Sequence, residues 1–237
     1  LCVSPLLSVP APAAGKVGAR ARPSITSKLV KLVSRDGLVM FAFITFSLSF
    51  LMVYVSSGCA AVGKDALGDV SASVRDSQVA SVMGNVGSFG MAGRFVLGFG
   101  ADFLQFVPAV GKAARWLCLM VACGLTTIVY FVFLTQYVAK GAADPHVWSV
   151  ASSVLAFGYG GFFSIFPATV RVLFNPADVG FFYGGLTSYA GVLNVVYSMV
   201  FVKMHWASPV WRVLTVGSIL DFIALVFTAW RSWGVPP

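Results

Sequence analysis

Two charged residues, Arg94 and Asp221, lie inside long apolar stretches of this 237-residue sequence. A charge in the middle of a bilayer costs at least about 2.5 kcal/mol, so we expect Arg94 to face the interior of a helix bundle or a wet cavity. Its planar guanidinium can donate two parallel hydrogen bonds to one carboxylate. The alternative is an arginine that backbone carbonyls satisfy, or that extends to the near membrane interface.

Other polar groups on the apolar stretches are uncharged. Asn194 and Tyr159 either line a cavity or make hydrogen bonds between helices. Asp102 lies at the end of an apolar stretch, and we expect it to cap the helix or to pair with Arg115 or Lys112.

No catalytic set is visible in the sequence. It has no nucleotide-binding loop, no Ser-His-Asp set, no HExxH motif and no paired carboxylates, so we expect neither an enzyme nor a cofactor. The cysteines show no metal-ligand spacing, and we expect no metal site. The net charge of +8 comes mainly from helix ends and the leading segment, so we expect no nucleic-acid partner.

The elements that must position these residues are helices of membrane length. Hydrophobic residues make up 58% of the chain and charged residues 10%, which is typical of an integral membrane protein. We predict an all-α bundle of six transmembrane helices over residues 38–231, followed by a short tail at 232–237. The predicted spans are 38–57, 79–102, 115–137, 147–171, 179–202 and 210–231. All six tryptophans fall near span ends, where indoles prefer the membrane interface.

The second span is unusually rich in glycine. In water each glycine would weaken a helix by roughly 1 kcal/mol relative to alanine, but in a bilayer unpaired backbone groups are so unfavourable that the segment stays helical. We expect the glycines to form a flat surface on which a neighbouring helix packs closely. They are Gly84, Gly87, Gly90, Gly93, Gly98 and Gly100.

Residues 1–37 form a basic, proline-rich leader, in which 24–35 is predicted to be an amphipathic helix on the membrane surface. Such acid-poor, arginine-rich leaders are typical of organellar transit segments, and a cytosolic loop before a membrane helix is the alternative. The leader also carries most of the positive charge on its side of the membrane. The positive-inside rule then places both termini in the cytoplasm, or in the matrix if the membrane is the mitochondrial inner membrane.

Several motifs resemble helices of one transporter family. Gly-x-x-Gly-Arg-x-x-x-Gly-x-x-x-Asp, read from Gly90 through Gly98 to Asp102, resembles the eighth helix of major facilitator superfamily transporters of the monocarboxylate, oxalate and nodulin-like branch. Residues 157–163 with Pro167 resemble the tenth helix of that branch, and residues 183–186 with Gly191 resemble its eleventh. Residues 35–37 resemble the approach to its seventh helix. The resemblance covers about 35–231, which corresponds to the second six-helix half of that fold.

The resemblance implies a role for several residues. In that branch the arginine matching Arg94 holds the carboxylate of an anionic substrate, and the proton-coupled members carry an aspartate where this chain has Gly90. The site of a whole transporter lies between two six-helix halves near the midplane. The last helix of each half is usually peripheral, so Asp221 would face another protein or be protonated, and we hypothesise that it marks a subunit contact.

Two functions remain open. One is a non-enzymatic accessory subunit of a larger organellar complex in the mitochondrial inner membrane, such as a respiratory or ATP-synthase assembly. The other is a transporter of a small organic anion, such as a monocarboxylate or amino acid, that works as a dimer of halves or as part of a longer chain. Sparse intramembrane charge, the glycine at position 90 and the leader favour the first. The expected partners are the lipid bilayer and either other membrane subunits or a second six-helix half.

Overall fold

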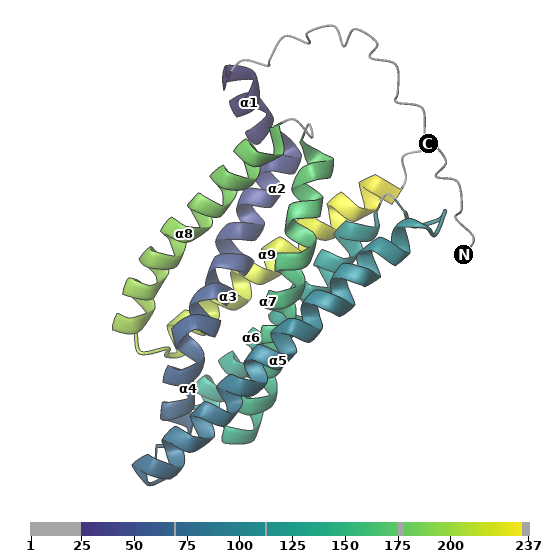
Figure 1. The fold of residues 1–237 in the computed structure, drawn as a ribbon. Helices are drawn as coiled ribbons and strands as arrows, with labels where there is room; N and C mark the ends of the chain where they lie inside the picture. Colours follow the sequence, from purple (N-terminus) through teal and green to yellow (C-terminus); the bar gives the residue numbers. More distant parts are fainter. Residues whose placement is uncertain (1–24, 69, 112, 175–177, 234–237) are drawn as a thin grey trace, which may run out of the picture.

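The computed structural model describes residues 25–68, 70–111, 113–174 and 178–233, so the first 24 residues of the leader and residues 234–237 of the tail lie outside it. Within the described residues the chain is helical, with no strand. Six long helical segments lie side by side in one bundle (Figure 1).

The first long segment is one continuous helix from Arg35 to Ala66, which we call the composite helix. It contains two π-helical turns, which occur in other proteins mostly as single turns and often at functional sites. Its parts are α2 (Arg35–Phe43), η1 (Ile44–Leu48), α3 (Ser49–Val53), η2 (Tyr54–Gly58) and α4 (Cys59–Ala66). The predicted end at residue 57 was too early, because Gly58 and Gly63 are buried against tryptophan rings that hold the extra turns.

The other five long helices each contain the span predicted for them. Each runs a few residues past the predicted span at one or both ends: α5 (Ala72–Gln105), α6 (Ala114–Lys140), α7 (Pro145–Leu173), α8 (Val179–Lys203) and α9 (Ser208–Trp233). Local sequence signals account for the turn between α6 and α7. Gly141 ends α6 with a φ of 73°, a left-handed conformation that glycine adopts easily. Asp144 begins α7 by accepting hydrogen bonds from the backbone N–H groups of His146 and Val147.

Within the described residues, five helical segments are long and apolar enough to cross a membrane. They are Gly37–Ala66, Ala114–Lys140, Pro145–Leu173, Val179–Phe201 and Ser208–Trp230. The helix α5 is not among them, although it is the longest, because its glycines and polar residues such as Asn85 and Arg94 make it less apolar. A crossing by α5 at the predicted span 79–102 therefore stays a prediction.

Packing in the bundle is uneven. The helix α5 lies along α7, α6 lies along α9 and α7, and the composite helix contacts α7, α8 and α9. In Figure 1, α8 and α5 lie at opposite edges of the bundle, with the composite helix and α7 between them. Of the five apolar segments, the one in α8 is the least buried.

The second half of the composite helix, α6, α9 and the turn between α8 and α9 meet around a group of rings. We call it the aromatic cluster, and it consists of Tyr54, Phe133, Tyr137, Trp206 and Trp211. The Trp211 ring lies 4.6 Å from that of Phe133 and 5.7 Å from that of Trp206, centroid to centroid. Trp206 and Trp211 are buried, as is Trp148. All three lie near helix ends, where glycines of the composite helix and neighbouring rings make room for them between the helices, and their predicted depth at the membrane interface stays a prediction.

The described part of the leader forms α1 (Ile25–Leu32), which is shorter than the predicted helix 24–35. The chain turns at Val33 and Ser34, and Ser34 caps α2 by accepting the Gly37 N–H at 3.4 Å. Lys28 of α1 forms an ion pair with Asp178, with Nζ and Oδ1 2.6 Å apart. This contact attaches α1 to the start of α8.

Candidate functional site

The helices α5 and α7 approach so closely that backbone touches backbone. A Cβ added at Gly93 would overlap the carbonyl of Phe157, and one added at Gly160 would overlap the carbonyl of Gly90. We call these four residues the glycine seam. Close approach of this kind is the usual role of small residues between membrane helices, so the flat glycine surface predicted from the sequence is present at Gly90 and Gly93.

The remaining glycines of α5 divide into two groups. Gly98 continues the packing toward α7, where an added Cβ would lie 3.2 Å from the Ser164 hydroxyl. An added Cβ at Gly84, Gly87 or Gly100 would meet nothing within 4 Å. The seam therefore takes up one side of α5 and leaves the other side open.

Arg94 lies on the open side. Its neighbour Gly93 is buried against α7, whereas the Arg94 side chain is exposed. Of the two predicted environments, the interior of this bundle does not hold Arg94, because consecutive helical residues point in different directions and the seam occupies the inward one. The arginine is therefore on the outside of this chain. That Arg94 faces a wet cavity stays a prediction.

A shallow groove of about 610 Å³ follows the same open side of α5. It exists partly because Gly84 and Gly87 have no side chains to fill it. The residues that line it are Gly84, Gly87, Ser88, Met91, Ala92 and Phe95. Next to it, the Phe95 and Phe99 rings stack with centroids 6.1 Å apart, and both side chains are exposed.

Two of the three predicted substrate-binding residues lie near each other. Tyr159, on α7, is half-buried, and it lies between Phe157 and Gly160, which pack against α5 next to Arg94. Asn194 is on α8, where it accepts a hydrogen bond from Ser198 of the same helix at 3.4 Å. Within the described residues no hydrogen bond joins Asn194 to Arg94 or Tyr159.

Asp102 is connected to Arg115, one of its predicted partners, only through Gln105. Its Oδ1 accepts a hydrogen bond from Gln105 Nε2 at 3.1 Å, and Gln105 Oε1 accepts one from the Arg115 guanidinium at 3.1 Å. Gln105 thus bridges the predicted pair and links the end of α5 to the start of α6. Lys112, the other predicted partner, lies outside the described residues.

Asp221 is buried inside this chain, with 1% of its surface exposed, and Ser47 of η1 donates a hydrogen bond to its Oδ2 at 2.5 Å. The hypothesis that Asp221 marks a subunit contact is wrong, because α9 turns this side chain toward η1 and α6 instead of outward. Nothing in the spacing of the sequence paired Asp221 with Ser47, since the two are 174 residues apart.

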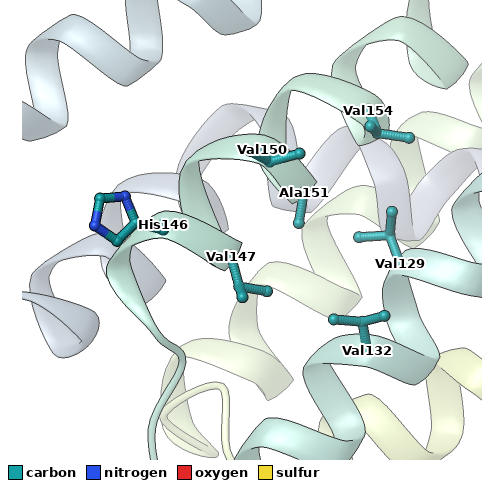
Figure 2. Close-up of a pocket in the computed structure, with 7 residues that line it drawn as sticks. All are labelled: Val129, Val132, His146, Val147, Val150, Ala151 and Val154. Carbon is teal, nitrogen blue, oxygen red and sulfur yellow. The ribbon is translucent and has the colours of Figure 1, made fainter.

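A second groove, of about 390 Å³, lies between α6 and α7 (Figure 2). Val129 and Val132 line it from α6, and Val147, Val150, Ala151 and Val154 line it from α7, with His146 at one end. All the residues that line it, except His146, are apolar. This groove was not predicted from the sequence, because valines within an apolar span look like the rest of the span. The only sequence signal for it is the spacing of three and four residues between the valines along α7.

Within the described residues, no group of three or more His, Cys, Asp or Glu side chains could hold a metal ion. Comparisons with known proteins give no match: no family model, no curated protein and no solved structure is similar to this chain. The resemblance to half of a major facilitator transporter therefore stays a prediction.

Proposed function

We propose that this chain is an integral membrane subunit, a six-helix bundle like one half of a major facilitator fold, that packs against another membrane protein through the open side of α5. The exposed position of Arg94 carries this proposal. The helix α5 lies along α7, which is apolar enough to cross a membrane, so the two helices share the same layer. An arginine facing lipid is costly by at least about 2.5 kcal/mol, and a protein partner removes that contact.

The rest of the open side has the composition of a protein interface. Aromatic residues, methionine and arginine are enriched in such interfaces. On α5 an exposed stripe repeats every four residues, which places its members on one face of the helix. The stripe consists of Met91, Phe95, Phe99 and Phe103, and Arg94 lies beside it.

The proposed role is that of a non-enzymatic accessory subunit of a larger complex. The mitochondrial inner membrane, with both termini in the matrix, is the location that the basic leader favours. A respiratory or ATP-synthase assembly is the kind of host that this location would provide. The partner surface is another membrane subunit that offers a carboxylate or backbone carbonyls to Arg94.

Photo-crosslinking in the native membrane tests the proposal. A photoreactive residue replaces Phe99 on the open side of α5, and in a control chain it replaces Val216, which is 59% exposed on α9. We expect the first to crosslink to a second protein and the control to crosslink mainly to lipid. Native-mass purification in mild detergent should show the chain in a large complex. Lipid adducts alone at both positions, with the chain migrating as a single copy, would contradict the proposal.

A second candidate function rests on the proximity of Arg94 and Tyr159. A guanidinium beside a phenol is a suitable pair of donors for a small carboxylate. In this alternative a second six-helix half, from another copy or from a longer chain, closes over the open side of α5 and forms a transport site. Arg94→Gln should then abolish uptake of small monocarboxylates into liposomes that contain the protein. Recovery as a free dimer with Arg94-dependent uptake would contradict the subunit proposal, and recovery in a large complex without uptake would contradict transport.

A further inference from the structure

A row of buried polar groups crosses the bundle where η1, α6 and α9 meet, separate from the open side of α5. It begins at Asp221, whose Oδ2 lies 2.5 Å from the Ser47 hydroxyl. The Ser47 hydroxyl also lies 3.6 Å from the Cys123 Sγ, which in turn donates to the backbone carbonyl of Ser218 at 3.5 Å. We call these four residues the polar row, and all four are buried.

An ionised Asp221 would be poorly satisfied in this position. Its Oδ2 would accept one hydrogen bond from Ser47, but its buried Oδ1 has no partner. Within the described residues no Lys, Arg or His forms an ion pair with it. A buried carboxylate without a countercharge or a full set of donors is strongly unfavourable in an apolar environment.

The titratable groups that face Asp221 from the neighbouring helices offer no compensation. They are Cys123 and Tyr130 on α6 and Tyr197 on α8. Each of these groups becomes negative when it loses a proton, so none can supply a positive charge. Only a proton or an external cation could neutralise the carboxylate here.

A protonated Asp221 fits the polar row without leaving a donor unpaired. With a proton on Asp221, the hydrogen bond between Ser47 and the carboxylate would reverse, so that the acid O–H donates to the Ser47 hydroxyl. The Ser47 O–H would then donate to the Cys123 sulfur, and the Cys123 S–H donates to the Ser218 carbonyl. Each of the three donors then has one acceptor within the polar row. No group in the row then carries a charge.

Ser47 owes its place in the row to a π-helical turn, since it belongs to η1. The hydroxyl of Thr45, in the same turn, lies 2.8 Å from that of Tyr189 on α8. Both contacts cross from the composite helix to a different helix. Turns of this type are rare and often occur at functional sites, and the one at η1 contributes Ser47 to the polar row.

We propose that the polar row is a proton-binding site, in which Asp221 holds a proton inside the bundle at neutral pH. The ligand is a proton, and Ser47, Cys123 and the Ser218 carbonyl are the groups that retain it. Loss of this proton leaves a buried charge between η1, α6 and α9. The site therefore links helix packing to pH, whichever partner covers α5.

Infrared spectroscopy of the purified full chain in lipid nanodiscs tests the site. A protonated carboxylic acid has a carbonyl stretch separate from the carboxylate bands, and exposed aspartates are ionised at neutral pH. We expect a protonated-acid band at neutral pH that disappears in Asp221→Asn and persists in the control Asp102→Asn. Absence of this band in the unmodified chain, or its persistence in Asp221→Asn, would overturn the proposal.

Two further measurements keep the test decisive. If Asp221→Asn fails to fold, Ser47→Ala keeps the acid but removes its acceptor, and it should shift the band without removing it; an unchanged band would contradict the row. The spectrum is also recorded with and without sodium and potassium salts. A band that appears only after these cations are removed would show a monovalent cation at the carboxylate and would overturn the proton assignment.

The pH dependence of unfolding provides an independent readout. The folded chain holds a proton that the unfolded chain releases to water, so stability should fall as the pH rises from mildly acidic to mildly alkaline. Asp221→Asn, a neutral side chain of nearly the same shape, should remove this fall. An equal pH dependence in the unmodified chain and in Asp221→Asn would contradict the proposal.

Discussion

Glycine makes two different kinds of contact in two regions of this bundle. On the composite helix, Gly58 lies against the ring of Trp206, and Gly63 likewise makes room for a tryptophan. In the glycine seam, Gly93 and Gly160 lie against the backbone of the facing helix. A side chain therefore fills the space left by glycine in the first region, and a whole helix fills it in the second.

The difference decides what each region can do. Large rings around Trp211 close the aromatic region from several directions, so little of it is left to contact another protein. The seam brings α5 close along one side only and leaves Arg94 and its neighbours exposed on the other. The aromatic region therefore stabilises the bundle, whereas the α5 region is available for a partner.

Trp211→Ala should have the largest effect. Its ring contacts the other rings of the aromatic cluster, and its Nε1 donates to the Trp206 carbonyl at 2.9 Å. Removing it leaves a cavity and an unpaired carbonyl, and we expect a loss of about 3–5 kcal/mol of unfolding free energy. Denaturant titration in mixed micelles measures this, with Trp230→Ala, whose ring is 72% exposed, as the control. Equal losses for the two variants would show that the aromatic cluster does not stabilise the bundle.

Gly160→Ala should have the next largest effect, because the added Cβ overlaps the Gly90 carbonyl and forces α5 away from α7. We expect it to lower the unfolding free energy by about 1–3 kcal/mol. The matched control is Gly87→Ala on the open side of α5, where an added Cβ meets nothing within 4 Å and helix propensity favours alanine. An unchanged unfolding free energy in Gly160→Ala would show that the seam is not closely packed.

A double-mutant cycle would sharpen the comparison between the two regions. Gly58→Ala collides with the Trp206 ring, so a smaller ring in Trp206→Phe should relieve part of the loss. We expect a coupling of about 1 kcal/mol between these substitutions in unfolding measurements. Phe157→Leu should give no such rescue of Gly93→Ala, because that added Cβ meets the backbone. Equal rescue in both cycles would remove the distinction between side-chain and backbone contacts.

The smallest effect is expected at Asp144, at the start of α7, the helix that borders both regions. The backbone N–H groups of His146 and Val147 lower the pKa of this carboxylate. Because the folded-state pKa is lowered, its contribution to stability is complete above the ordinary aspartate pKa of about 3.9 and is lost as pH falls through the lowered value. Thermal unfolding in acid should show a slightly weaker pH dependence in Asp144→Ala. A pH dependence identical to that of the unmodified chain would contradict this cap.

Much of the fold was predictable, because hydropathy marks membrane-length helices directly. Segments 147–171 and 179–202 each lie within one observed helix. The boundary at residue 57 was not predictable, because the same glycine that ends a helix in solution continues one here when Trp206 packs on it. The partners of buried polar groups were also hidden, since Ser47 and Asp221 are far apart in the chain.

The sequence alone determined where the helices lie, their apolar character and the glycine surface for close packing. Only the tertiary structure decided which face of each helix points into the bundle, and it placed Arg94 on the outside and Asp221 on the inside. The physical reason is that lipid and protein interior are both apolar, so hydrophobic periodicity does not distinguish them within a membrane. Contacts between helices supply the missing direction, and those contacts exist only once the bundle has formed.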